Sequence, residues 1–407
     1  MFIFIGTGRT RRCHRNLQEP ATARDDSGGH NIMKLGVSSW RMNAARFGVV
    51  RYTDYLVSAM SRRLSSDDSI TLFAPLPITP PVKSQGAPIY QRTIGPRLTN
   101  AVWENLILPF FASDMDVLFG PSYTLPLLSP GKKVVCIHSV NEAEKGQHSF
   151  WYDLTYGLKY RLSCKVADRV IVNSQSTKDR VVSYYGIPPE KIDVIWLGVD
   201  EKFQPLEGEH ADEKNRDTRV QYIGGDRPYV LFVGTMSARR NIPILIKAFA
   251  NAKHKHDLPH ALFLVGQNRE DIPIEQLAKD AGIEDSVVHF GGTFEQHGGI
   301  IPIYNAADLF VMPANTEGFS LTLPEAMACG VPAITSASSS LGEVANGYAY
   351  TLDFIKEDNL SSAIAEVLTD RELHQQLRAR GLERAKGLRW DECARKTLEV
   401  LRQVAES

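Results

Sequence analysis

Short apolar runs alternate with amphipathic stretches along most of this chain, and this alternation constrains its fold more than any other feature. The runs are rich in Val, Ile, Leu and Phe, as expected of strands that are buried on both faces of a parallel sheet. In the first half they are KLGVSSW, SITLFA, DVLFG, KVVCIHS, DRVIVNS and KIDVIWLG. In the second half they are YVLFVG, ALFLVG, SVVHFGG, LFVMPA and PAITSA. The pattern predicts an α/β fold with two doubly wound, parallel-sheet domains.

The stretches between these strands have helical periodicity. Helices are expected over 51–64, 98–112, 152–167, 177–185, 242–252 and 390–404. The apolar segment from Leu106 to Ala112 is too short to span a membrane, so we expect a buried or interfacial helix there.

A change of composition divides the chain. Residues 204–226 are charged and polar and contain three glycines, which is typical of a domain boundary. We therefore predict a first domain over 34–203, a linker over 204–228 and a second domain over 229–387. The final stretch, 388–407, is expected to form a helix that packs back on the first domain.

Residues 1–33 show no core pattern and are expected to be a disordered extension. Their apolar MFIFIG precedes the basic RTRRCHR, the reverse of the order in a secretory signal. A transit peptide or an upstream start are the alternatives.

Composition excludes several classes of protein. The formal net charge of −1 gives no overall field that would attract nucleic acid, so no nucleic-acid partner is expected. The five cysteines include no C-x-x-C pair, which disfavours a zinc site or a disulfide framework and favours a reducing, cytoplasmic compartment. No G-x-G-x-x-G loop follows the first strand and no Walker A lysine loop is present, which argues against a nicotinamide-dependent oxidoreductase.

Candidate chemistry concentrates in PANTEGFSLTLPEAMACGVPAITS, residues 313–336. Glu317 lies in a loop at the carboxyl end of a strand, where open α/β sheets bind ligands. The backbone amides from Gly318 to Leu321 precede a helix and suit a phosphate. Glu325 lies in the first turn of that helix, and Thr322-x-x-Glu325 is equally consistent with a capping box. A solvated loop carboxylate is the alternative for Glu317.

A second cluster follows the strand YVLFVG. Arg239 and Arg240 precede Asn241, a suitable N-cap for the next helix. Cations are unfavourable at a helix N-terminus unless an anion such as a diphosphate binds there. Two solvent-facing arginines are the alternative. In the first half, His138 ends a core strand, which is more often a structural than a catalytic position.

Several motifs together resemble those of the retaining glycosyltransferase family 4, whose fold, GT-B, has two facing Rossmann-like domains. They occur in the family's order as FGVVRY, WENLILP, VLFGPSYTLPLL with VVCIHS, DRVIVNSQST, VIWLGVD, VGTMSARRN and TEGFSLTLPEAMACGVPAI. The last is the most specific. This sequence departs from the pattern in having Arg240 for Lys, Ser320 for Gly and Ser139 for Asp.

The resemblance implies a role for each matching residue. Glu317 and His138 would lie near the transferred sugar, and Glu325 would bind the ribose hydroxyls of the nucleotide. Arg239 and Arg240 would hold the diphosphate. The remaining positions would contribute backbone or close approach: Gly48, Gly318, Phe319, Ser320 and Leu321 toward the sugar and phosphates, and Gly292 and Thr293 near the base.

The resemblance also implies a reaction. A hexose, with mannose favoured, would move with retention from a nucleotide sugar, GDP-mannose ahead of UDP-sugars, to a glycan or lipid-linked acceptor. Neither a metal nor another cofactor is expected. The helix over 152–165 could meet a lipid-linked acceptor at the inner face of a membrane, or be a solvated surface. The main rival is a catalytically silent GT-B binding module. The pattern indicates no oligomeric state.

Overall fold

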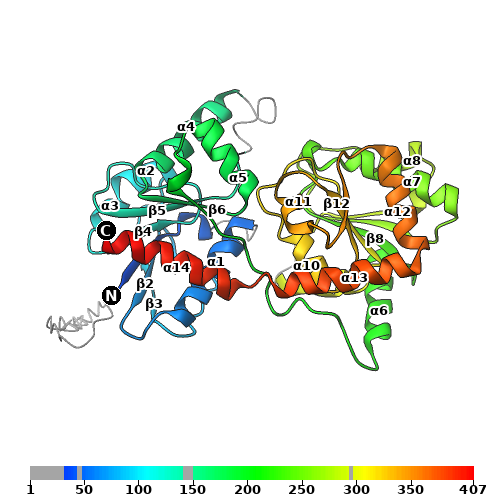
Figure 1. Ribbon diagram of the computed structural model, residues 1–407, viewed down its shortest axis with the longest axis horizontal. Coiled ribbons are helices and arrows are strands. Elements are labelled where there is room, and N and C mark those ends of the chain that lie inside the picture. Colours follow the sequence, from blue (N-terminus) through cyan, green and yellow to red (C-terminus); the bar gives the residue numbers. More distant parts are fainter. Residues whose placement is uncertain (1–31, 44–47, 141–149, 293–296) are drawn as a thin grey trace, which may run out of the picture. The chain divides into compact units, whose positions relative to one another are not determined.

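A computed structural model of the chain describes residues 32–43, 48–140, 150–292 and 297–407 (Figure 1). The predictions for residues 1–31 and for Thr293 therefore lie outside the described residues. Residues 33–407 form one compact unit, which contains two sheets with parallel strand pairing throughout. The predicted α/β class, with two doubly wound domains, is confirmed.

The first sheet has seven strands in the order β3-β2-β1-β4-β5-β6-β7. Its strands are β1 (Lys34–Ser38), β2 (Ser69–Ala74), β3 (Ile89–Thr93), β4 (Val117–Gly120), β5 (Lys132–Ile137), β6 (Arg169–Val172) and β7 (Ile192–Val194). Its helices are α1 (Gly48–Arg63), α2 (Asn100–Leu106), α3 (Leu108–Phe111), α4 (Phe150–Val166) and α5 (Gln175–Arg180), which continues as a π-helical turn over Val181–Tyr185.

The second sheet has six strands in the order β10-β9-β8-β11-β12-β13. Its strands are β8 (Tyr229–Val233), β9 (Ala261–Val265), β10 (Val287–Phe290), β11 (Leu309–Met312), β12 (Ala333–Ser336) and β13 (Tyr350–Leu352). Its helices are α7 (Ile242–His256), α8 (Ile274–Asp280), α9 (Ile301–Asn305), α10 (Thr322–Ala328), α11 (Ser339–Ala345), α12 (Glu357–Thr369) and α13 (Arg371–Lys386).

The apolar runs form the buried strands of both sheets, and β8, β9, β11 and β12 are buried along their whole length. Two strands, β3 and β13, were not predicted, and each lies at one edge of its sheet. The residues of β3 after Ile89 are exposed, so this strand carries no continuous apolar run.

Two expected elements differ in detail. The single helix expected over 98–112 is divided at Ile107 into α2 and α3. Pro109 lies in the first turn of α3, where its missing N–H is tolerated because first-turn N–H groups have no partner within the helix. In the interior of one continuous helix, Pro109 would remove a backbone hydrogen bond. The stretch expected to be a linker contains a helix, α6 (Ala211–Ile223). Only Thr218 and Ile223 of α6 are buried, so the sequence shows no apolar stripe there.

The last helix, α14 (Trp390–Glu406), packs against α1 of the first domain (Figure 1). The Trp390 ring stacks on Tyr55 with 5.3 Å between ring centroids. The chain reaches α14 through a close backbone crossing, where the Val199 N–H donates to the Leu388 carbonyl at 2.9 Å. This crossing depends on Gly198, since a Cβ there would lie 2.1 Å from the Trp390 nitrogen.

We expect Gly198→Ala to destabilise the protein by about 1–3 kcal/mol, because backbone atoms must separate to admit the methyl group. Gly157→Ala is the matched control. A Cβ at Gly157, inside α4, meets no atom within 4 Å, so this change should be neutral or slightly stabilising. Urea unfolding midpoints measure both. Equal unfolding midpoints for Gly198→Ala and the wild type would contradict the close approach of Gly198 to the Trp390 backbone.

Candidate functional site

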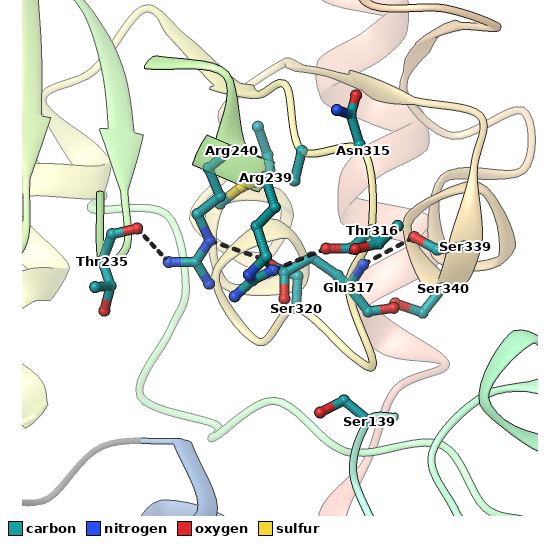
Figure 2. A network of polar contacts seen from close by, with 12 residues as sticks. Ser139, Thr235, Arg239, Arg240, Asn315, Thr316, Glu317, Ser320, Ser339 and Ser340 are labelled. Carbon is teal, nitrogen blue, oxygen red and sulfur yellow. Dashed lines mark hydrogen bonds and ion pairs between the residues drawn. The ribbon is translucent and has the colours of Figure 1, made fainter. Parts of the chain in front are cut away.

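Two loops meet at the carboxyl edge of the second sheet. One follows β8 and contains Arg239 and Arg240, and the other follows β11 and contains Glu317. Because β8 and β11 are hydrogen-bonded parallel neighbours, their carboxyl ends lie at the same edge. Figure 2 shows the side chains of the two loops pointing toward one another.

One carboxylate oxygen joins the two arginines. The Glu317 Oε1 atom lies 2.7 Å from Arg239 Nη1 and 2.8 Å from Arg240 Nε (Figure 2). Each guanidinium also donates to backbone, Arg239 to the Thr316 carbonyl at 2.7 Å and Arg240 to the Thr235 carbonyl at 2.8 Å. The Glu317 side chain is 8% exposed and the arginine side chains 14–21%. The alternative interpretation, in which these three residues are solvated surface charges, is therefore wrong.

The charges within this cluster favour an ionised carboxylate. Burial by itself would raise the pKa of Glu317, but the Arg240 and Arg239 guanidinium groups hold that pKa below its ordinary value. Within this cluster, two cations and one anion leave one excess positive charge. Such a site favours an anionic ligand.

Asn241 joins the same loops, although not in the way the sequence suggests. It occupies the N-cap position of α7 in a left-handed conformation with φ of 52°, and its side chain does not cap the helix. Its amide instead donates to the Pro313 carbonyl and to Asn315 Oδ1, both at 2.8 Å. The N-cap expectation was right in position and wrong in hydrogen bonding. A capping side chain accepts from a helix N–H and usually has an extended backbone, whereas Asn241 is left-handed and its Oδ1 accepts from the Asn315 amide at 3.5 Å.

Glu325 is buried at 2% exposure in the first turn of α10. Tyr304 donates its hydroxyl to Glu325 Oε2 at 3.2 Å, and Arg51 of α1 donates to Glu325 Oε1. The N-cap of α10 is Leu321, and no side chain caps this helix. The capping-box interpretation is therefore wrong, since the Thr322 hydroxyl pairs with Ser320 Oγ instead, at 3.0 Å.

Arg51 and Tyr304 are site residues that sequence analysis did not select. Arg51 belongs to the FGVVRY motif, in which Gly48 alone was a predicted site residue. Tyr304 lies in the short helix α9 and has no motif of its own. A long-range contact with Glu325 is what identifies each of them.

The loop after Glu317 reaches the first domain. A Cβ at Gly318 would lie 1.7 Å from the His138 carbonyl oxygen, so only glycine fits there. The Gly318 carbonyl accepts from Ser174 Oγ at 3.0 Å. Ser320 and Leu321 are buried, and Phe319 packs against the apolar cores on both sides.

His138 follows β5, and both of its ring nitrogens have partners. Nε2 donates to the Pro121 carbonyl at 2.7 Å, and Nδ1 accepts from the Asn173 amide at 2.6 Å. Burial lowers the pKa of His138 to about 4, so the ring is neutral near pH 7. Both ring nitrogens are thus hydrogen-bonded, as expected of a histidine with a structural role. The backbone oxygen of His138 faces Gly318.

The remaining predicted positions differ in their surroundings. Gly48 is the first residue of α1, and a Cβ there would meet no atom within 4 Å. A Cβ at Gly292 would lie 2.6 Å from the Phe290 ring. Within the described ranges, no group of three or more His, Cys, Asp and Glu side chains is arranged to hold a metal ion. No helix in that part of the chain has the length and apolarity needed to cross a bilayer.

Comparison with known proteins gives two curated relatives. O-antigen chain mannosyltransferase B of Escherichia coli is 27% identical over 236 residues, which make up 58% of this chain and 60% of that protein. A D-inositol 3-phosphate glycosyltransferase of Corynebacterium kroppenstedtii is 30% identical over 182 residues, or 43% of this chain and 39% of that protein. Both alignments thus span less than two thirds of the relative.

A solved structure shows the fold. Anabaena Alr3699/HepE, crystallised in complex with UDP and glucose, superposes with a TM-score of 0.72 at 16% identity. The superposition covers 91% of this chain and 100% of that one. It supports assignment of the two parallel-sheet domains to the GT-B fold.

Two family models match successive parts of the chain. The model described as Glycosyltransferase Family 4 matches residues 48–203. The model described as Glycosyl transferases group 1 matches residues 213–384, which include every predicted site residue of the second domain. From these matches and its GT-B fold, the chain belongs to the group 1 glycosyltransferases of family 4.

Proposed function

We propose that this protein is a retaining glycosyltransferase that moves a hexose, with mannose favoured, from a nucleoside diphosphate sugar to a glycan or lipid-linked acceptor. The observation that carries the proposal is the cluster of Glu317, Arg239 and Arg240 at the carboxyl edge of the second sheet. It combines a buried carboxylate with cations suited to a diphosphate.

The arginines would stabilise the charge that develops on the departing group. During transfer, the bond between the anomeric carbon and the β-phosphate oxygen breaks, and the anomeric carbon bonds to an acceptor hydroxyl oxygen. The hydroxyl proton passes to the diphosphate. Arg239 and Arg240 are already oriented by backbone carbonyls, so little reorganisation accompanies charge development. We propose that they supply the positive charge without a metal or another cofactor.

The remaining roles follow from position. Glu317 would contact the sugar while it holds both arginines in place. Glu325, buried between Tyr304 and Arg51, would accept hydrogen bonds from the ribose hydroxyls. Gly48 would let α1 approach the phosphates, and Thr293 would lie near the base.

Similarity supports the sugar and the donor class. The E. coli relative is named a mannosyltransferase, and the superposed Anabaena structure contains UDP. These names favour a hexose carried on a nucleoside diphosphate. GDP-mannose remains our first choice of donor, and UDP-sugars follow.

A thermal-shift screen of GDP-mannose, UDP-glucose and ADP-glucose tests the donor. We expect GDP-mannose to raise the melting temperature most, since only the folded state binds it. Isotope-labelled donor should then be hydrolysed or transferred, and the anomeric configuration of a transferred product should match that of the donor. Donor binding without turnover in the presence of candidate acceptors would favour the catalytically silent module.

We expect Arg240→Ala to weaken nucleoside diphosphate binding by about 1.5–3 kcal/mol, because a charge-assisted contact is lost. Binding of the free nucleoside should hardly change. Arg371→Ala, which removes an exposed arginine at the start of α13, is the control. Isothermal titration of the wild type and both variants measures the affinity for each ligand. An equal loss for both ligands would show that Arg240 does not face the phosphates.

Glu317→Gln should keep nucleoside diphosphate affinity within a few-fold, since glutamine retains one acceptor for the arginines. Transfer should fall by orders of magnitude, because the carboxylate charge near the sugar is lost. Initial rates at saturating donor measure this. Near-normal turnover of Glu317→Gln would exclude a catalytic role for the carboxylate.

Glu325→Ala should weaken binding of every nucleotide ligand, including the nucleoside alone. Tyr304→Phe removes only the hydroxyl that positions Glu325 and should give a smaller loss. Tyr229→Phe is the matched control, because the Tyr229 hydroxyl is also buried but donates to the Ile303 carbonyl. If Tyr304→Phe and Tyr229→Phe bind nucleotide equally well, Tyr304 has no positioning role.

A further inference from the structure

A run of serines lies beside the loop that carries Glu317. Residues 336–340 read SASSS and extend from the last residue of β12 into the first turn of α11. Because β11 and β12 are hydrogen-bonded parallel neighbours, the segment after β12 lies next to the loop after β11. Figure 2 shows Ser339 and Ser340 beside Glu317. The run is therefore placed to support the loop that contains the carboxylate of the site.

The first two hydroxyls of the run bind the loop ahead of Glu317. Ser336 Oγ donates to the Ala314 carbonyl and Ser338 Oγ to the Asn315 carbonyl, both at 2.7 Å. Ser338 is the N-cap residue of α11 and has the extended backbone of a cap, but its side chain makes no capping hydrogen bond. Its hydroxyl therefore stabilises the loop instead of the helix.

The next two hydroxyls bind the backbone of Glu317 itself. Ser339 Oγ accepts from the Glu317 N–H at 3.0 Å (Figure 2), and Ser340 Oγ donates to the Glu317 carbonyl, also at 3.0 Å. Both polar groups of this residue's main chain are thus fixed beside the carboxylate that contacts the two arginines. Because a side chain extends from its own Cα, a shift of this backbone would move the carboxylate relative to the guanidinium groups.

Ser339 has a backbone conformation that favours glycine. Its φ is 55°, in the left-handed region where a Cβ crowds the following carbonyl oxygen. Such strain persists where the surrounding structure requires it, and functional sites are one place where it occurs. Glycine would relieve the strain, but it would also remove the hydroxyl that accepts from the Glu317 N–H. The contact with Glu317 is therefore what serine supplies at this position and glycine does not.

We propose that Ser339 is a positioning residue, whose hydroxyl fixes the Glu317 backbone so that the carboxylate stays in contact with Arg239 and Arg240. Ser339 acts through Glu317 and need not touch the donor or the acceptor. The inference rests on the proposed function, since it assumes that the position of this carboxylate controls the rate of transfer. It extends that function to a residue that the sequence did not select.

Two variants of Ser339 and one control test this. Ser339→Gly removes the hydroxyl and the strain, whereas Ser339→Ala removes the hydroxyl and keeps the strain. Both should lower kcat about tenfold or more, with nucleoside diphosphate affinity within a few-fold of wild type, because a hydrogen bond that positions the carboxylate is lost. Ser339→Ala should unfold at a lower urea concentration than Ser339→Gly.

Asp257→Gly is the matched control. Asp257 is exposed, has a φ of 50° and lies at the C-cap of α7, the opposite end of that helix from the site. It should keep the wild-type kcat, although it also replaces a left-handed residue by glycine. An unchanged kcat in Ser339→Gly, or a kcat that falls only in the less stable Ser339→Ala, would overturn the proposal.

Two further measurements separate this inference from the proposed function. In a Glu317→Gln chain, Ser339→Gly should lower kcat no further, since Ser339 acts through the carboxylate. Amide hydrogen exchange over residues 313–320 should be faster in Ser339→Gly than in Asp257→Gly, whether or not sugar is transferred. A wild type that transfers no sugar would overturn the proposed function and this inference together. Unchanged exchange, or a further loss of kcat in the Glu317→Gln chain, would overturn only the role of Ser339.

Discussion

The parallel pairing of β8 with β11 is the constraint on which the candidate site depends. It places the ends of two strands that are far apart in sequence at one edge of the sheet, so the loops that follow them meet. The Glu317 carboxylate then links Arg239 to Arg240 in a partly buried cluster. A buried carboxylate without partners would be strongly destabilised, so each arginine stabilises Glu317 in addition to its role in the proposed chemistry.

Contacts with the first domain complete this arrangement. Gly318 approaches the His138 carbonyl more closely than any other residue could, and Arg51 reaches Glu325 from α1. The last helix, α14, returns to pack on α1, so the chain joins the two sheets twice. The groups proposed to bind sugar and ribose are thus positioned by residues from both domains.

The sequence predicted most of the fold because buried strands of parallel sheets are continuously apolar. β8 and β9 are recognisable for this reason, whereas β3 and β13 are outer strands with exposed residues and carry no such signal. Glu317, Arg239 and Arg240 could be selected from their positions after strands. Tyr304 could not, since its importance lies in one hydrogen bond to a residue 21 positions away.

Local pattern therefore determined the class of fold, the order of its elements and the segments that carry charge at the edges of strands. Only the tertiary structure decided how those charges pair. The sequence was equally consistent with two roles for Glu325, in a capping box or in contact with a ligand, because both place a carboxylate in the first turn of a helix. The structure excludes the capping box, since Tyr304 and Arg51 supply the donors. It likewise decided that the apolar residues of α2 occupy two faces, because only the packing of Trp103 fixes which face of the helix is buried.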